Sequence, residues 1–167
     1  DVSKTGYSSD KTYPQGDPLN PNPVKPHATV AAQTVTQVSF AIDRVSTLNV
    51  RTSDVVCSPI SGQNLTLQGS KLIGTSPDVL KFSTSSATNA SGLKTFNSIE
   101  WDTYAIGFSG AGNYLVGTMP LSPLVINPNS TQDFRFVLEP SSPNGLLISV
   151  KDSGSGAAIN GATVNLS

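Results

Sequence analysis

Apolar and polar residues alternate in short runs along most of the chain. Thr47–Arg51, Thr103–Phe108 and Asp133–Leu138 each place apolar side chains at every second position. A period of two is the spacing of a β-strand that buries one face, and no stretch shows the period of about 3.6 residues that a long helix requires. Clusters of Gly, Pro, Asn and Ser separate the runs. The pattern predicts an all-β sandwich.

The alternation predicts eight strands between residues 46 and 139 and a core formed by their inward-facing side chains. The expected strands are Thr47–Arg51, Asn64–Lys71, Val79–Thr84, Leu93–Ser98, Thr103–Phe108, Tyr114–Thr118, Leu124–Ile126 and Asp133–Leu138. The expected core residues are Leu48, Val50, Leu65, Leu67, Leu80, Phe82, Leu93, Ile99, Tyr104, Ile106, Phe108, Tyr114, Leu115, Phe134, Phe136 and Leu138. A stretch of this length is enough for one sandwich core.

The two ends of the chain repeat its middle. Gln37–Asp43 (QVSFAID) has the alternation of Asp133–Glu139 (DFRFVLE), and Leu147–Leu166 aligns with Thr47–Leu67. A repeat separated by about one small domain is typical of a tandem array. We therefore expect closing strands of a preceding module in residues 1–44, a complete module in 45–139, a linker in 140–145 and opening strands of a following module in 146–167.

Residues 14–26 (PQGDPLNPNPVKP) interrupt the first of these segments. Proline fixes the backbone angle φ and lacks a donor, so this stretch should run extended over the surface. Closing strands are expected after it, at residues 29–32 and 36–43.

Composition and charge exclude several partners. Only 13% of the residues are charged, the net charge is −1, and the ten Lys and Arg residues are scattered. We therefore expect no nucleic-acid binding and no membrane contact in this segment. Residues 1–25 do not resemble a signal peptide, so an export signal would lie outside the sequence. Cys57 is the single cysteine, which leaves no disulfide within the chain.

Specific residues carry a family resemblance. Leu146–Leu166 (LLISVKDSGSGAAINGATVNL) resembles the opening of a carboxypeptidase-regulatory-like domain, which is a transthyretin-like sandwich of seven strands. Ser91-Gly92, Thr103–Ile106 and the Gly112–Tyr114 corner are similar to later parts of the same family. The sequence departs from the family at Ile99–Asp102, where a small turn closing on Gly is usual.

The resemblance implies an Ig-like or transthyretin-like antiparallel β-sandwich of about seven strands in a tandem array. It also implies a non-catalytic spacer module of a bacterial surface or secreted protein, which extends and displays other domains. On that basis we expect an extracellular or cell-surface location, no enzyme activity and no cofactor or metal.

The residues offer little catalytic machinery. His27 and Cys57 are the single histidine and cysteine, and no pattern around either residue marks an activated nucleophile. They are too few for a self-contained zinc site. Glu100 and Asp102 would share a face at about 7 Å if they stood in one strand, as paired carboxylates of a glycosidase do. A solvated connection between strands is the favoured interpretation of this pair.

Binding is the alternative function. Glu100, Trp101, Asp102 and Thr103 would suit a carbohydrate, because an exposed indole stacks on a sugar ring while carboxylates bind its hydroxyls. A protein ligand on the same surface is a further alternative. The competing expectation, which we favour, is that Trp101 seals the open end of the core. Asp17 and Asp152 match no calcium loop.

Two further hypotheses concern covalent and non-covalent links. Sandwich domains of bacterial pili carry Lys–Asn cross-links, but Lys71, Lys81 and Lys94 do not stand at core-facing positions of the first strand. The incomplete ends, Val2–Asp43 and Leu146–Leu166, would each leave an unpaired strand edge, which predicts pairing with neighbouring modules or other copies of the chain by strand complementation. The competing expectation is that the ends pack onto their own central module or stay mobile.

Overall fold

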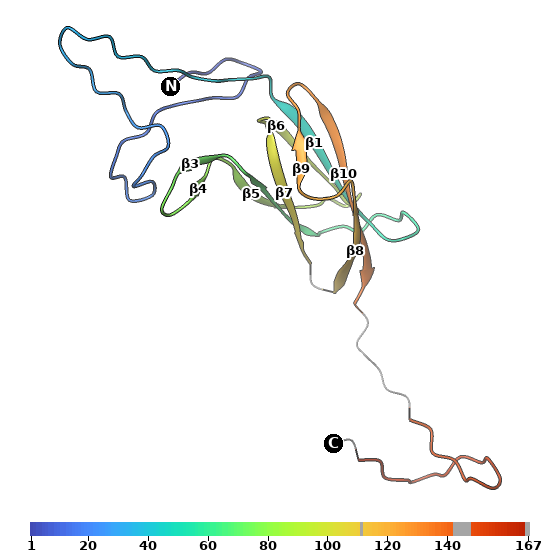
Figure 1. Cartoon of the computed structure of the whole chain (residues 1–167). Helices are drawn as coiled ribbons and strands as arrows, with labels where there is room; N and C mark the ends of the chain where they lie inside the picture. Colours follow the sequence, from blue (N-terminus) through green and yellow to red (C-terminus); the bar gives the residue numbers. More distant parts are fainter. Residues whose placement is uncertain (111, 142–147, 166–167) are drawn as a thin grey trace.

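The computed structural model describes residues 1–110, 112–141 and 148–165, and these contain strands but no helix. Two four-stranded sheets face each other across the core (Figure 1). The first sheet has the order β6 (Leu93–Ile99), β1 (Ser46–Ser53), β10 (Thr131–Pro140) and β8 (Asn113–Met119). The second has the order β5 (Ser83–Ala87), β2 (Asn64–Gly69), β7 (Asp102–Ser109) and β9 (Leu124–Ile126). A separate hairpin joins β3 (Leu72–Gly74) to β4 (Val79–Leu80). The predicted all-β sandwich is confirmed.

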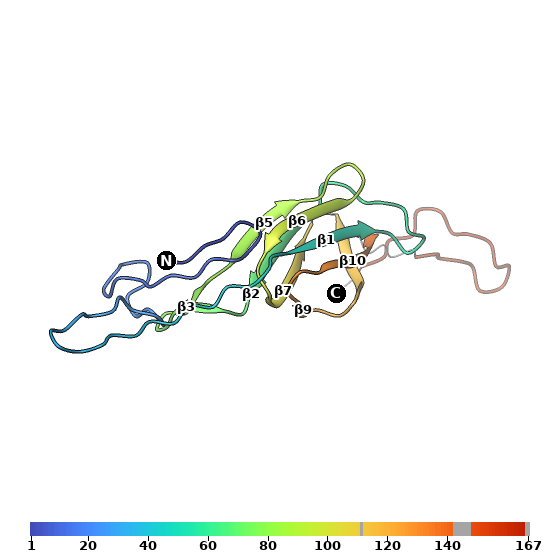
Figure 2. The ribbon, with the colours of Figure 1, turned by 90° about the horizontal axis from the view of Figure 1, so that it is seen from above.

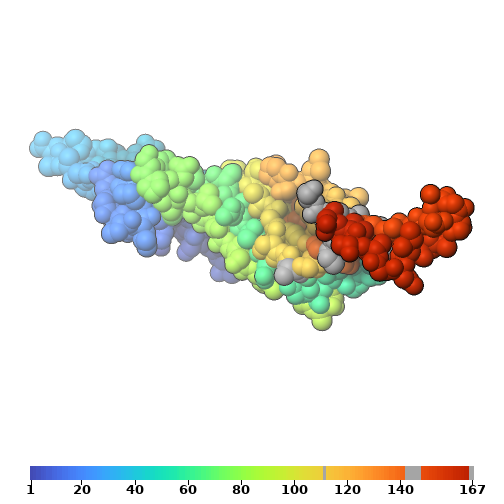
Figure 3. All heavy atoms as spheres, turned by 90° about the horizontal axis from the view of Figure 1, so that it is seen from below, coloured from blue at the N-terminus to red at the C-terminus, as the bar shows by residue number. Residues whose placement is uncertain are grey.

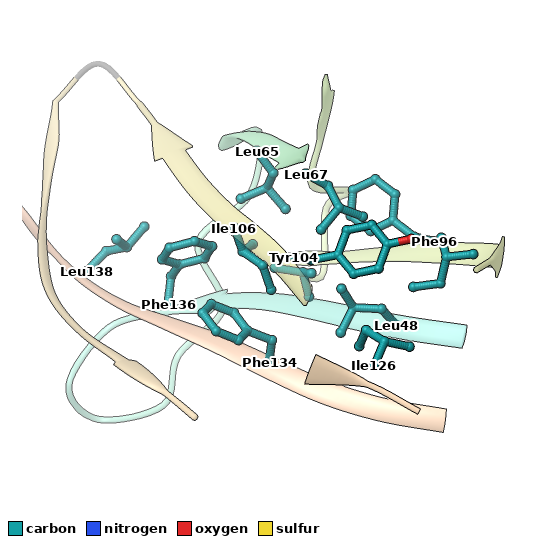
Figure 4. Close-up of a cluster of buried hydrophobic side chains, with 12 residues drawn as sticks. Leu48, Leu65, Leu67, Phe96, Tyr104, Ile106, Ile126, Phe134, Phe136 and Leu138 are labelled. Atoms are coloured by element: carbon teal, nitrogen blue, oxygen red, sulfur yellow. The ribbon is translucent and has the colours of Figure 1, made fainter. Parts of the chain in front are cut away.

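The core lies between the two four-stranded sheets (Figure 4). Its buried side chains are Leu48, Val50, Leu65, Leu67, Phe96, Ile99, Tyr104, Ile106, Ile126, Phe134, Phe136 and Leu138. Phe134 and Phe136 follow one another on the same face of β10, with ring centroids 5.1 Å apart in an edge-to-face arrangement. Phe108 of the opposite sheet lies 5.9 Å from Phe136, so aromatic contacts join the two layers.

The pairing of β1 with β10 is parallel, which differs from the fully antiparallel sandwich expected. Val50 lies opposite Phe134, and Thr52 lies opposite Phe136. A parallel pair needs a long connection, and here the rest of the sandwich supplies it. Because the two strands run in the same direction and in register, the chain enters the sandwich at one end and leaves it at the other.

Residues 1–45, called the arm below, precede β1 and form isolated bridges but no strand. The strands expected at 29–32 and 36–43 are absent from the structure. In the described chain, no strand pairs with residues 29–32 or 36–43, and Val30 and Val35 are 83% and 98% exposed. The assignment of the arm to a preceding module stays a prediction, as does strand complementation between copies.

The arm lies against the β3–β4 hairpin. The amide of Val24 donates to the carbonyl of Ile73 at 3.0 Å, and the amide of Thr75 donates to the carbonyl of Asn22 at 3.0 Å. The buried Asn20 side chain also donates to the carbonyl of Ile73. The proline-rich stretch does not run extended as expected. Turns at residues 15–16 and 18–19 and bends at 21–22 and 24–25 fold it back, so that Tyr13 pairs with Pro26, and the stretch contacts the β3–β4 hairpin through Pro23 and Val24.

The strand predictions hold in position, with differences at two places. The expected strand Val79–Thr84 is divided into β4 and β5, and β3 was not expected. Of the expected core residues, Tyr114 and Leu115 are 49% and 46% exposed. They belong to β8, an edge strand whose pairing with β10 shifts register between Val137 and Leu138. That shift moves the alternation out of phase with the core.

Near the C-terminus, the structure describes residues 148–165. Asp152 accepts hydrogen bonds from Gly154 and Ser155 in a turn, and Lys151 forms a bridge with Ala158. Most of the expected linker at 140–145, and both ends of the expected module opening at 146–167, lie outside the described residues. The arm and the C-terminal segment lie at opposite ends of the molecule (Figures 2 and 3). In the part of the chain that is described, no helix is long and apolar enough to cross a membrane.

The core makes a direct prediction. Phe136→Ala should lower the free energy of unfolding by about 3–5 kcal/mol, because the side chain is 1% exposed and the cavity left would lie between the two sheets. Val125→Ala is the control, since Val125 is 58% exposed, and it should change stability by less than about 0.5 kcal/mol. Urea denaturation followed by circular dichroism measures both, and equal losses would contradict the assignment of the core.

Candidate functional site

The connection between β6 and β7 carries the most concentrated polar chemistry of the molecule. The strands on either side end and begin on buried residues, Ile99 and Asp102, which are 1% and 7% exposed. Glu100 and Trp101 fill the short connection between them. Both side chains contribute to the surface that the sandwich presents to the arm.

Glu100 binds two lysines at once. Lys71 Nζ lies 2.6 Å from Glu100 Oε1, and Lys81 Nζ lies 2.6 Å from Oε2. Only 15% of the Glu100 side chain and 24% of each lysine side chain is exposed. Lys81 also donates to the carbonyl of Ser9 in the arm at 2.9 Å. The ion pairs therefore connect the β6–β7 connection, the β3–β4 hairpin and the arm.

Trp101 lies outside the core. It is 42% exposed, and Lys71 Nζ lies 3.2 Å from the centroid of its ring, a cation–π contact. The expectation that Trp101 seals the core is wrong, because Ile99 and Tyr104 fill that end from the strands themselves. The indole instead forms part of a surface shared with the arm.

Asp102 has a structural role. Its carboxylate accepts hydrogen bonds from Ser70 Oγ at 2.7 Å and from the Lys71 amide at 3.1 Å, which fixes the start of the β3–β4 hairpin. Tyr104 donates from its hydroxyl to the carbonyl of Glu100. Burial, followed by the charges of Asp102 and Glu100, raises the pKa of Tyr104. Thr103 lies in β7 opposite Val125. The four residues predicted as one platform thus divide, and only Glu100 and Trp101 of the four line the pocket described next.

A pocket of about 270 Å³, called the arm pocket below, lies between the arm and the sandwich. The arm contributes the charged residues Asp10, Lys11 and Lys25 and the aromatic Tyr13. The sandwich contributes Lys71, Lys81, Glu100 and Trp101. A second hollow of about 310 Å³ lies on the other side of Glu100 and is lined by Tyr7, Phe82 and Tyr104 among others.

Asp10 and Lys25 pair within the arm pocket, with Lys25 Nζ 2.5 Å from Asp10 Oδ2. Lys25 also donates to the carbonyl of Ser39, and the amide of Ala41 donates to Asp10. Burial alone would raise the pKa of Asp10, but the hydrogen bonds from Lys25 and Ala41 and the charge of Lys25 outweigh it, so the pKa is lowered. Burial raises the pKa of Tyr13, and Asp10 and Glu100 add to the effect.

The arm residues of this pocket were not found from the sequence, because their partners lie far along the chain. Lys81 and Ser9, for example, are 72 positions apart. One signal was available: Asp10, Lys11 and Lys25 concentrate charge around a proline-rich stretch of a chain with few charges.

The other candidate residues do not assemble into a site. His27 pairs with the hydroxyl of Thr12 within the arm, whereas the exposed Cys57 lies 3.3 Å from Arg135 of β10. Lys94 lies over the ring of Phe96, while Lys71 and Lys81 are held by Glu100. Within the described ranges, no group of three or more His, Cys, Asp and Glu residues could hold a metal ion.

Comparison with known proteins found little. No family model matches the chain, and no curated protein matches it. Among solved structures, the full-length major pilin SpaD from Corynebacterium diphtheriae is similar with a TM-score of 0.39 and 10% sequence identity. The match covers 56% of this chain and 30% of the pilin chain. Similarity at this level supports no functional argument, and the resemblance to carboxypeptidase-regulatory-like domains stays a prediction.

The double ion pair of Glu100 predicts a clear stability difference. Glu100→Gln should lower the free energy of unfolding by about 1–3 kcal/mol, because two largely buried ammonium groups lose their counterion. Glu139→Gln is the matched control, since Glu139 is the other glutamate of the chain and pairs with Tyr114 at an exposed position. It should cost less than about 0.5 kcal/mol. Equal effects in chemical denaturation would show that the ion pairs do not stabilise the fold.

The ionisation of Asp10 predicts a pH-dependent signal in the arm. Because its folded-state pKa lies below the ordinary 3.8, the stabilisation from Asp10 is complete above pH 3.8 and is lost as the pH falls through the lower value. The amide of Ala41, 3.0 Å from Asp10 Oδ2, should shift in NMR spectra with that midpoint. In Asp10→Asn the shift should vanish. A midpoint above 3.8 would contradict the ion pair.

Proposed function

We propose that this chain is a structural spacer module of a bacterial surface or secreted protein, which extends and displays the domains joined to it. The observation that carries the proposal is the parallel pairing of β1 with β10. Each residue of β1 from Thr47 to Ser53 lies beside a residue of β10 from Thr131 to Val137. The chain therefore enters and leaves at opposite ends, and each such module adds its length to the distance spanned.

The length added is set by the longest strand. β10 has 10 residues, which at about 3.3 Å per residue corresponds to a sandwich roughly 33 Å long. An antiparallel pairing of the first and last strands would bring both ends of the chain to the same side and add little reach. A module inserted in series therefore needs the arrangement found here.

The arm supports the proposal because part of it is fixed to the sandwich by several contacts. Backbone hydrogen bonds join Asn22 and Val24 to the β3–β4 hairpin, and the side chain of Asn22 donates to the carbonyl of Ser76 at 3.1 Å. Prolines at positions 21, 23 and 26 restrict the same stretch before any contact forms. This stretch of the arm is thus held against the sandwich, and it would help to orient a preceding domain.

The proposed role also agrees with the state of the carboxylates. Glu100 is bound by two lysines, and Asp102 accepts hydrogen bonds that fix a strand connection. Neither group is placed as a free acid or base. The family resemblance and the low charge of the chain favour the same non-catalytic role at a bacterial surface.

Gly74 allows one contact between the arm and the β3–β4 hairpin to be disrupted without a change in the sandwich core. A Cβ at Gly74 would lie 1.8 Å from Asn20 Oδ1, so Gly74→Ala should expel Asn20 and break its bond to Ile73. Gly117→Ala is the matched control, because a Cβ there meets nothing within 4 Å. Dyes on the native Cys57 and on Val35→Cys, both at exposed positions, would report the direction of the arm by single-molecule energy transfer.

The native chain and Gly117→Ala should each give one narrow distribution of transfer efficiency, and Gly74→Ala should broaden it. A flexible chain of comparable length would give a broad distribution from the start. If the native chain is as broad as Gly74→Ala, the arm is not stiff and the spacer proposal loses its support.

A further inference from the structure

We propose that the arm pocket binds an acidic sugar unit, such as a hexuronate residue within a polysaccharide. The pocket combines an excess of positive charge with two aromatic side chains in a space the size of one sugar ring. This inference goes beyond the spacer role, because a module that only extends a chain needs no such pocket.

The charge of the pocket favours an anion. Four lysines, at positions 11, 25, 71 and 81, face two carboxylates, Asp10 and Glu100, in a chain whose net charge is −1. Lys71 and Lys81 share Glu100, so this trio keeps one positive charge. Among the described residues Lys11 takes part in no ion pair and lies 5.0 Å from the ring of Tyr13. A carboxylate entering here would meet ammonium groups from both walls.

The shape of the pocket favours a sugar over an acidic peptide. Its volume of about 270 Å³ is near the lower end of the roughly 300–1,000 Å³ typical of small-molecule sites, so it suits a single ring. Trp101 and Tyr13 provide aromatic surface, and Val24 and Ile73 add an apolar wall. One face of each ring is already covered, by Lys71 on Trp101 and by Lys11 on Tyr13. A pyranose would pack its C–H face on the aromatic surface that these lysines leave free, and its carboxylate would meet the same ammonium groups. An extended acidic peptide has no ring to match it.

Both the arm and the sandwich contribute to the pocket, so it is complete only while the arm is attached. A bound ligand should therefore strengthen the attachment, and release of the arm should weaken binding, as linkage requires. Gly74→Ala tests this coupling, because it displaces Asn20, which does not line the pocket. A weaker affinity in this variant would come from the altered attachment of the arm and not from the loss of a direct contact with the ligand.

The experiment is titration calorimetry on the whole chain with three probes of matched length. These are a tetragalacturonate, a neutral galactose tetrasaccharide and tetraglutamate. Trp101 is the single tryptophan, so its fluorescence provides an independent signal from the pocket itself. The tetragalacturonate should bind, should change the fluorescence and should bind more weakly as salt is added. The other two probes should bind at least about tenfold more weakly.

Variants test the residues. Lys11→Gln should weaken binding of the tetragalacturonate about two- to fivefold, as expected for an exposed charge pair. Trp101→Ala should weaken it about three- to tenfold through loss of aromatic contact. Lys94→Gln is the matched control, because Lys94 lies over Phe96 on β6, and it should change nothing. Thermal melting verifies that each variant is folded. If Trp101→Ala does not fold, Lys11→Gln alone is enough to test the proposal.

Four results would overturn the proposal. They are absence of binding, equal binding of the neutral sugar, equal binding of tetraglutamate, and an unchanged affinity in Lys11→Gln. Equal binding of the peptide would assign the pocket to acidic protein segments instead. The energy-transfer measurement on the native chain reports the attachment of the arm independently. Absence of binding together with a narrow transfer distribution therefore overturns the sugar proposal and leaves the spacer role intact.

Discussion

The parallel contact between β1 and β10 is the constraint on which the rest of the structure depends. The two strands lie side by side in the middle of one sheet, with β6 and β8 outside them. Leu48 and Val50 of β1 and Phe134 and Phe136 of β10 meet in the core, so hydrophobic burial stabilises the same pair that the backbone hydrogen bonds define. Their separation of about 84 residues makes this an expensive contact to form early in folding, because the intervening chain must be ordered to support it.

The second organising feature is the shared carboxylate of Glu100. Each of its two oxygens binds one ammonium group in a space that excludes much of the solvent, so each ion pair is screened less than a surface pair would be. Lys81 also donates a hydrogen bond to the carbonyl of Ser9 in the arm. The ion pair with Glu100 therefore links the arm to the connection between β6 and β7. The same geometry holds Lys71 against Trp101, and the indole is thereby kept at the surface.

Local patterns predicted the sandwich well where a strand has neighbours on both sides. The alternation of Leu65 and Leu67 in β2 and of Tyr104 and Ile106 in β7 assigned these side chains to the core, and all are buried. The same rule was wrong for Tyr114 and Leu115, which lie in the edge strand β8. The register shift in the pairing of β8 with β10 interrupts the alternation, so these side chains do not point into the core. It omitted Phe96 and Ile126, which the packing of the two sheets selects.

The site could be predicted only in part, for a related reason. Glu100 and Trp101 stand out in the sequence as an acid and an indole at a strand connection, but their partners do not. Lys25 and Tyr13 reach the pocket because the arm pairs with β3, a strand too short to be marked by alternation. Side chains brought together by such a contact carry no shared pattern along the sequence.

The segment around Pro23, which covers the edge of β3, also limits the addition of a further strand to the β3–β4 hairpin. An uncovered strand edge presents donors and acceptors that another chain can use, which is the usual route to aggregation. Here Pro23 forms the bridge to Gly74, and Pro21 and Pro26 lie close by in the same segment. Since proline has no backbone N–H, the outer side of this cover offers few donors to a further strand. In a protein held at high local density beside copies of itself, such a border would keep neighbouring molecules from joining edge to edge.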